Sequence, residues 1–224
     1  MLRQPAAGYR AGADAMLLAA AVSPGERLME AGCGVGAALL AAALRFPQAR
    51  LTGVEREPAM AALARENVAA NGLGDRVSIV EDDVLAGSAG VFDSVFCNPP
   101  FAQEGEGTEP HAARRHAHVT EAPLDGWSAA LSNRLTGGGR LTLIHRADKL
   151  AEILAALDGR LGAVTVFPVR PRAGAPASRV LVRAQKGSRG PLVLLRGLDL
   201  HDDSGAKFTT EAEAIFRGRA AIDW

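Results

Sequence analysis

The sequence has little cysteine, no long apolar run and no net charge. Cys33 and Cys97 form no C-x-x-C pair, so neither a disulfide framework nor a zinc site is indicated, and both thiols are expected to be reduced. The longest apolar runs, such as 15–22, fall far short of the roughly 20 residues that a membrane-spanning helix needs. The 25 basic side chains balance 25 acidic ones, so a nucleic acid would have to bind a local patch.

Other absences exclude further classes of function. The first residues, MLRQP, lack the apolar core of a secretion signal, so we expect a cytoplasmic protein without a membrane partner. The chain has no internal repeat, no G-x-x-x-x-G-K-(S/T) phosphate loop and no convincingly spaced Ser-His-Asp or Cys-His set. With 224 residues, 48% of them apolar, it fits one globular domain.

A glycine-rich turn follows the first expected strand, 27–31. Gly32, Gly34 and Gly36 separate this strand from an Ala/Leu-rich helix, and glycine lets the backbone approach a ligand closely where a strand ends. The turn also matches the G-x-G-x-x-(G/A) pattern of dinucleotide-binding folds, an alternative that the glycines alone leave open. Glu30 favours a different ligand, because a carboxylate just before the glycines repels a pyrophosphate but attracts a cation.

Acidic residues follow the next two expected strands. Glu55 comes after the strand 50–54, where a carboxylate can accept hydrogen bonds from both hydroxyls of a ribose. Because Pro58 begins the next helix, Glu55 can also be a solvated residue that opens that helix. Two adjacent acids, Asp82 and Asp83, follow the strand expected at 77–80.

The stretch 92–101, FDSVFCNPPF, is typical of a buried strand that ends at two prolines. Pro99 and Pro100 supply no backbone N–H, and each forces the preceding residue out of the helical region. Asn98 is therefore extended at the carboxyl end of a strand, where open α/β sheets bind ligands. The Asn98 amide oxygen and the Pro99 carbonyl can together accept both hydrogens of a planar NH2 group. Phe101 offers a flat face on which a base can stack.

These residues carry a resemblance to a known family. The N-P-P-F turn at 98–101 resembles the (N/D)-P-P-(Y/F) motif of S-adenosylmethionine-dependent methyltransferases that alkylate exocyclic or amide nitrogens. The E-x-G-x-G sequence at 30–34 is similar to the first motif of the class I enzymes. The resemblance implies an α/β, Rossmann-like three-layer sandwich with a mostly parallel sheet and an antiparallel edge strand. It also implies S-adenosylmethionine as cofactor, S-adenosylhomocysteine as product and no metal.

The resemblance assigns roles to individual residues. In the family an acid at the place of Asp83 accepts from the adenine amine of the cofactor, and Asp82 is the alternative. The segment before the glycine strand contacts the methionine end. The catalytic residues are then expected to be Asn98, Pro99, Pro100 and Phe101. The expected cofactor-binding residues are Arg10, Asp14, Glu30, Gly32, Gly34, Gly36, Glu55, Asp82, Asp83, Val84 and Asn98.

Three further motifs resemble the bacterial tRNA adenine-N6 methyltransferases, which include enzymes that act beside the anticodon of a valine tRNA. They are G-Y-R-A-G-x-D-A-x-L-L-A at 8–19, A-S-R-V-L-V at 177–182 and L-H-x-x-x-G-x-x-F-T-x-E at 200–211. This resemblance predicts an RNA substrate, in particular tRNA. It predicts one methyltransferase domain over residues 1–224, with a short N-terminal segment that caps the cofactor and a C-terminal strand and helix.

Two other functions stay open at this point. A protein glutamine N5-methyltransferase uses the same turn, since a side-chain amide is also a planar NH2. A catalytically silent, cofactor-binding subunit of a larger assembly would share the fold.

The residues that contact the substrate are open as well, because Arg114 and Arg115 could touch phosphates. A basic stretch could face RNA or form solvated edge strands; it comprises Arg170, Arg172, Arg179, Arg183, Lys186 and Arg189.

Overall fold

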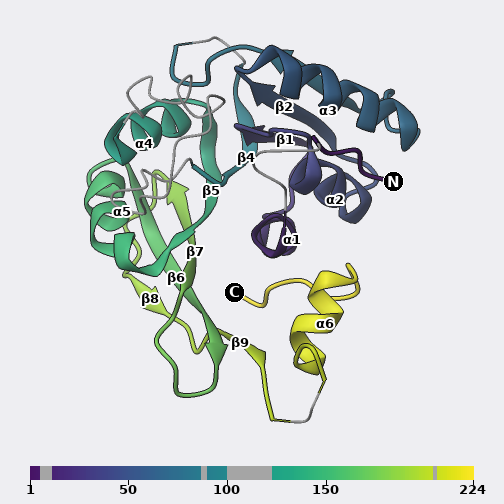
Figure 1. Cartoon of the computed structure of the whole chain (residues 1–224). Coiled ribbons are helices and arrows are strands. Elements are labelled where there is room, and N and C mark those ends of the chain that lie inside the picture. Colours follow the sequence, from purple (N-terminus) through teal and green to yellow (C-terminus); the bar gives the residue numbers. More distant parts are fainter. Residues whose placement is uncertain (6–11, 87–89, 100–122, 204–205) are drawn as a thin grey trace, which may run out of the picture.

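We analysed a computed structural model, which describes residues 1–5, 12–86, 90–99, 123–203 and 206–224 (Figure 1). The strands are β1 (Arg27–Ala31), β2 (Arg50–Glu55), β3 (Val77–Glu81), β4 (Phe92–Cys97), β5 (Leu135–Arg146), β6 (Leu161–Arg172), β7 (Arg179–Lys186), β8 (Val193–Leu194) and β9 (Leu198–His201). The helices are α1 (Ala13–Ala21), α2 (Ala37–Arg45), α3 (Pro58–Ala70), α4 (Leu124–Asn133), α5 (Leu150–Leu157) and α6 (Thr210–Phe216), with a 3-10 turn, η2 (Ala147–Lys149), before α5.

The described strands form one sheet in the order β3-β2-β1-β4-β5-β7-β6-β8, and β9 also pairs with β6. Strands β1 to β5 run parallel to one another, whereas β7 is antiparallel to both of its neighbours, β5 and β6. The strand order reverses direction between β1 and β4, which is where open α/β sheets place their ligands. This topology confirms the expected α/β class with a mostly parallel sheet and an antiparallel strand toward one side.

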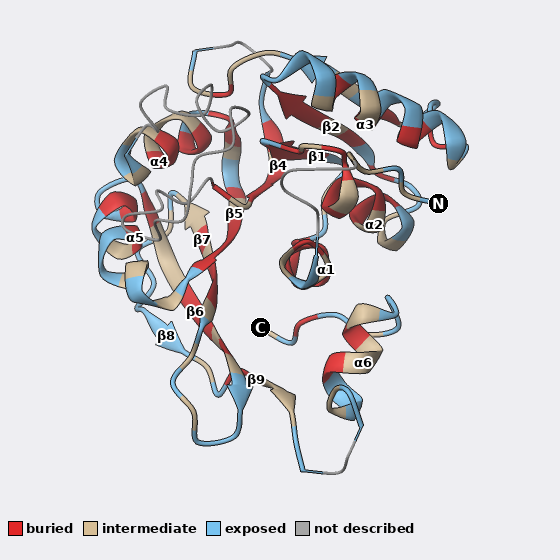
Figure 2. Ribbon diagram, in the orientation of Figure 1, coloured by how far each residue is buried: buried red, intermediate tan, exposed pale blue. Residues whose placement is uncertain are grey.

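Two apolar cores, one on each face of the sheet, produce the expected three layers. One core combines residues of α1, α2 and α6 with one face of the strands. The other combines residues of α4 and α5 with the opposite face. Figure 2 shows buried residues along the strands and on the helix sides that face them. Because successive strand residues point to opposite faces, the central strands are apolar nearly throughout, as in parallel sheets covered on both sides.

The C-terminal residues close the core beside α1. The Ile222 N–H donates to the Ala20 carbonyl (2.9 Å), and the Trp224 indole N–H donates to the Ala21 carbonyl (2.9 Å). Trp224 lies edge-on to Phe167, with ring centroids 6.2 Å apart, and the Arg183 guanidinium lies over the Trp224 ring. Figure 1 shows α6 and the C-terminus beside α1. The last residues of the chain are therefore part of the layer that covers one face of the sheet.

The glycine triplet at 137–139 lies inside a strand. These residues belong to β5, and the register against β4 shifts between Phe92 and Ser94, which pair with Leu135 and Arg140. The extra residues of β5 form a bulge, a feature that glycine favours inside a strand. A side chain at Gly139 would place its Cβ 3.1 Å from the Asp93 carbonyl oxygen, so a larger residue would be tightly packed there.

The final helix, α6, begins at a threonine cap. Thr209 is the N-cap, and its hydroxyl oxygen accepts from the Ala212 N–H (3.2 Å). Glu213 therefore lies one position too far along the helix for a capping box, and it pairs instead with Arg217. No helix among the described residues is long and apolar enough to cross a membrane.

Candidate active site

The carboxyl ends of β1, β2, β3 and β4 meet at one edge of the sheet. Parallel pairing aligns Glu30 with Gly53 on one side and with Phe96 on the other, and it aligns Glu55 with Glu81. The glycine turn, the acids after β2 and β3 and the Asn98 turn all follow these strand ends. The topology therefore brings together four motifs that lie far apart in the sequence.

The glycine turn has the backbone geometry that the sequence predicts. Gly32, Gly34 and Gly36 have φ values of 68°, 53° and 83°, a left-handed region that favours glycine. The Gly32 N–H donates to the Val54 carbonyl (2.8 Å), which fixes the turn against β2. A Cβ built on Gly34 meets nothing within 4 Å, so the turn faces open space there. The turn can therefore take a ligand against its backbone.

A second-strand glycine that the sequence analysis missed supports this turn. A Cβ at Gly53 would lie 2.7 Å from the Cys33 sulfur and 2.7 Å from a methyl carbon of Leu39. Only a residue without a side chain lets the turn and the start of α2 pack this closely on β2. A glycine inside the expected strand 50–54 indicates that another segment packs closely against the strand there. The sequence alone does not identify that segment.

Glu55 organises the turn as well as ending β2. Its Oε2 accepts from the Gly34 N–H (2.8 Å) and its Oε1 accepts from the Glu57 N–H (2.9 Å). The side chain is buried, with 9% of its surface exposed, so it is not the solvated residue of the alternative interpretation. A carboxylate oxygen can accept more than one hydrogen bond, so both oxygens retain capacity for a ligand hydroxyl.

Glu30 presents a buried carboxylate beside the turn. Only 4% of the residue is exposed, and its Oε2 has no hydrogen-bond partner among the described residues. Burial raises the pKa of Glu30 well above its ordinary value; the Leu39 N–H opposes this shift and the Glu55 carboxylate adds to it. An uncompensated buried carboxylate is costly, and a cationic ligand would relieve that cost. The sulfonium and ammonium groups of S-adenosylmethionine fit this site, whereas a pyrophosphate does not.

The acids after β3 form a compact turn. The Asp82 Oδ1 accepts from the Asp83 N–H (2.8 Å), and the Asp83 Oδ1 accepts from the Leu85 N–H (2.9 Å). Val84 is buried, and its carbonyl accepts from the buried Arg134 guanidinium at the end of α4 (3.1 Å). Asp82 and Asp83 each use one carboxylate oxygen to shape the turn. The geometry therefore does not show which of the two would contact the adenine of the cofactor. Arg134 is a support that the sequence analysis missed.

Asn98 and Pro99 follow β4 directly. Pro99 is buried, and Asn98 is half-buried at the end of a strand whose last four residues are buried. At the other end of β4, the Asp93 Oδ2 accepts from the backbone N–H groups of Glu26 and Arg27 (both 3.0 Å), which ties β4 to the start of β1. The position of Asn98 relative to the glycine turn is therefore set by the pairing of β4 with β1.

The N-terminal segment is attached to the glycine turn through α3. The fully buried Asn67 accepts from the Arg3 N–H (2.7 Å), and its Nδ2 donates to the carbonyls of Arg3 (2.9 Å) and Val35 (3.0 Å). The Gln4 amide oxygen is buried without a hydrogen-bond partner in the described part of the chain. Residues 1–5 therefore lie beside the turn, and Asn67 is the residue that holds them there.

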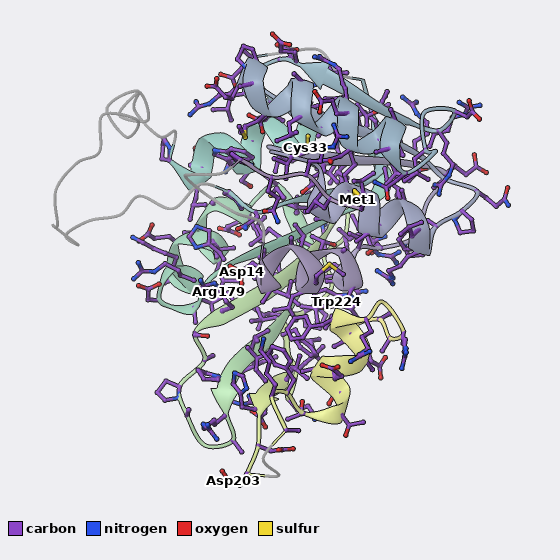
Figure 3. The ribbon with its side chains drawn as sticks, turned by 45° about the vertical axis from the view of Figure 1, so that its right-hand side comes forward. Met1, Asp14, Cys33, Arg179, Asp203 and Trp224 are labelled. Atoms are coloured by element: carbon purple, nitrogen blue, oxygen red, sulfur yellow. The ribbon has the colours of Figure 1, made fainter. Side chains whose placement is uncertain are left out.

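Three of the expected site residues, Arg10, Pro100 and Phe101, lie outside the described residues, as do Arg114 and Arg115. Asp14 lies on α1, where its Oδ2 accepts from the Arg179 Nε of β7 (2.9 Å). In Figure 3 the two labelled side chains lie close together. The structure thus gives Asp14 a contact that the sequence analysis did not anticipate.

Neither nucleophilic nor metal chemistry has support among the described residues. Cys33 and Cys97 are free and buried, and burial raises the pKa of both thiols, with a further contribution from Glu30. The thiols therefore stay protonated and are poor nucleophiles. No group of three or more His, Cys, Asp or Glu side chains in the described ranges is arranged to hold a metal ion.

Comparison with known proteins identifies the family. Residues 10–168 match the model of the methyltransferase small domain. A tRNA1(Val) (adenine(37)-N6)-methyltransferase of Porphyromonas gingivalis is 32% identical over 191 residues, which cover 80% of this chain and 75% of the relative. A release factor glutamine methyltransferase of Deinococcus radiodurans is 36% identical over 90 residues, which cover 40% of this chain and 32% of that protein.

A solved structure agrees with this match. A protein of Agrobacterium tumefaciens, described as a predicted O-methyltransferase, superimposes with a TM-score of 0.77 and 31% identity, over 93% of this chain and 98% of that one. The expected methyltransferase activity and its dependence on S-adenosylmethionine are confirmed. The chain belongs to the methyltransferase small domain family of S-adenosylmethionine-dependent methyltransferases.

Proposed function

We propose that the protein methylates the exocyclic N6 amine of an adenine in RNA, and that the RNA is a tRNA. The observation that supports this most is the match over 75% of a tRNA1(Val) (adenine(37)-N6)-methyltransferase, combined with an Asn-Pro sequence at the carboxyl end of β4. Such an enzyme would work where tRNA is found, in the cytoplasm. We take the whole of residues 1–224 as one methyltransferase domain.

In this proposal, one set of residues binds the cofactor. The backbone of the glycine turn, the Glu55 carboxylate and one of the two acids after β3 hold its methionine, ribose and adenine parts. Glu30 provides the negative charge that a sulfonium and an ammonium require. When bound, S-adenosylmethionine supplies an electrophilic methyl carbon. Arg10 and Asp14 remain proposed contacts of its methionine end.

Asn98 and Pro99 would hold the acceptor nitrogen. Their two oxygens accept the hydrogens of the adenine NH2 group and localise its lone pair, while the base stacks on Phe101 beyond Pro100. No base has to remove a proton beforehand, because the amine becomes acidic only as positive charge develops on it. Alignment of the two reacting groups is the main contribution, up to about 7–11 kcal/mol for a well-oriented pair. Asn98 contributes more if its contact strengthens as that charge develops.

The experiment is methyl transfer from tritiated S-adenosylmethionine to total RNA and total protein from a strain that lacks the gene. We expect label in tRNA, and nucleoside mass spectrometry should identify it as N6-methyladenosine. Label on a glutamine side chain would instead support the protein glutamine methyltransferase, which the shorter match to the Deinococcus protein favours. Label on an oxygen would support an O-methyltransferase, and cofactor binding without turnover would support a silent subunit.

A further inference from the structure

Two arginines lie directly opposite each other at the carboxyl edge of the sheet, on the side away from the glycine turn. The register of β5 and β7 pairs Arg146 with Arg179. Like charges in opposed positions of an antiparallel pair repel each other and lower stability. Side chains two residues apart on a strand share a face, so Arg146 lies on the face of Ile144 and Arg179 on that of Leu181. Both apolar residues belong to the core beside α1, so the two arginines share that face of the sheet.

The register also places these arginines near Asn98. Cys97 pairs with Leu143, so Asn98 lies level with Ile144, one strand away from β5. In ideal strand geometry, with strands about 4.8 Å apart and about 3.3 Å per residue, this register separates the Cα atoms of Arg146 and Asn98 by about 8 Å and those of Arg179 and Asn98 by about 12 Å. These separations suit a phosphate next to a nucleotide whose base is held at Asn98.

Each guanidinium already holds an anion of this chain. Arg146 donates from Nε and Nη2 to the two oxygens of Asp148 (3.0 and 2.5 Å), an exposed pair with 46% and 54% of the side chains accessible. Arg179 donates to Asp14, in a pair of 32% and 21% accessibility. This bidentate contact with Asp148 has the geometry in which arginine also binds a phosphate. An exposed ion pair is worth little, so a phosphate can replace Asp148 at low cost.

Four other cations of the basic stretch have different surroundings. Lys186 lies at the opposite edge, where it donates to the Leu135 carbonyl at the start of β5 (2.8 Å). Arg183 lies over Trp224. Arg170 and Arg172 form ion pairs with Asp199 and Asp203 beside β9. The basic stretch of the sequence is thus dispersed over the sheet, and Arg179 gains a neighbour, Arg146, that lies outside the stretch.

We propose that Arg146 and Arg179 form a phosphate-binding pair that contacts the RNA backbone beside the target nucleotide. This inference rests on the proposed function, because it takes RNA as the substrate. In this arrangement Asp148 occupies the Arg146 guanidinium until a phosphate replaces it. Arg179 contributes from β7, where Asp14 of α1 pairs with its guanidinium.

The test compares Arg146→Gln with a matched control, Arg140→Gln. Both changes remove one guanidinium from β5, and both residues pair with residues of β7. Arg140, however, pairs with Gln185, at the end of β7 away from Arg179. Binding of a tRNA anticodon stem-loop is measured over a salt series, together with kcat and KM for RNA and the affinity for S-adenosylmethionine. The variant Arg146→Lys retains the positive charge but cannot form a bidentate contact with a phosphate.

We expect Arg146→Gln to raise the Kd and the KM for RNA roughly tenfold, the loss typical of one hydrogen bond between charged groups. The slope of log K against log salt should fall by about 0.7, as for one lost contact with a single strand. Arg146→Lys should keep most of that slope, and Arg140→Gln should match the wild type. Unchanged cofactor affinity shows that Arg146→Gln is folded.

An Arg146→Gln protein with wild-type RNA affinity and salt slope would overturn the inference, as would equal losses in Arg140→Gln. So would a wild-type protein that does not bind the stem-loop. Failure of the proposed function has a different signature. In that case the wild type transfers no methyl group to RNA, whatever the two arginine variants do to RNA binding.

Discussion

The two halves of the sheet's carboxyl edge carry different charged side chains. The half formed by β1, β2 and β3 ends in carboxylates, and the half formed by β5, β7 and β6 ends in arginines. The acids are Glu30, Glu55, Glu81, Asp82 and Asp83, and the arginines are Arg146, Arg170, Arg172 and Arg179. Asn98 lies between the two halves. On one side the strand ends carry carboxylates that can face a cation, and on the other they carry guanidinium groups, each paired with an acid of this chain.

The largest expected effect comes from Asn98, which lies between the two halves of the carboxyl edge. Asn98→Ala should lower kcat by about 10²–10³ and leave the affinity for S-adenosylmethionine almost unchanged, as expected for loss of one preorganised polar contact. Steady-state methyl transfer and calorimetric titration measure the two quantities. Turnover close to that of the wild type would remove Asn98 from the proposed mechanism.

In the acidic half, the charge of Glu30 should matter more for the ligand than for the fold. Glu30→Gln should weaken S-adenosylmethionine binding about 10- to 100-fold, because a contact with a charged partner is lost, as measured by calorimetry. The same change should stabilise the protein without cofactor, since it removes a buried, uncompensated carboxylate. Loss of both stability and affinity would show that the carboxylate is needed for folding instead.

The pH dependence gives this prediction a second readout. The folded-state pKa of Glu30 lies above its unfolded value of about 4.5, so its contribution to stability is full below 4.5 and is lost as the pH rises through the folded value. The gap in melting temperature between Glu30→Gln and the wild type should therefore widen from pH 5 to pH 8. Thermal unfolding of both proteins without cofactor measures the gap, and a constant gap would contradict the assignment.

Steric support of the glycine turn should have an intermediate effect. Gly53→Ala places a Cβ against Cys33 and Leu39, and overpacking of this kind costs about 1–3 kcal/mol of unfolding free energy. We expect lower stability in denaturant titration and weaker cofactor binding, with RNA affinity unchanged. Gly74→Ala is the control, since a Cβ there meets nothing within 4 Å and its φ is not positive. Equal effects at both positions would argue against close packing at Gly53.

The smallest expected effect is a gain in the basic half. Asp148→Asn removes the anion that competes with phosphate for Arg146, so RNA binding should tighten by about two- to fivefold, because an exposed ion pair is weak. The salt dependence should become steeper at the same time. Weaker RNA binding would mean that Asp148 supports the arginine rather than competes for it.

Sequence reasoning located most of the elements because their local signals were strong. The strand and glycine turn at 27–36, the carboxylate after β2 and the proline-terminated strand β4 all have the predicted bounds within a residue. Local signals failed where long-range pairing decided the conformation. The glycines at 137–139 form a bulge in β5 because Asp93 and its neighbours on β4 lie against them, and no pattern within the triplet indicates that.

The sequence by itself determined the chemistry available, namely a glycine turn after an acid, carboxylates after successive strands and an Asn-Pro turn, since these depend on residue type and short spacing. Only the tertiary structure decided which charges share an edge. Strand order brings Glu30 beside Phe96, and antiparallel pairing brings Arg146 opposite Arg179 while it takes Lys186 to the far side of the sheet. The physical reason is that strand register, set by burial of both faces of the sheet, fixes neighbours that sequence separation does not reveal.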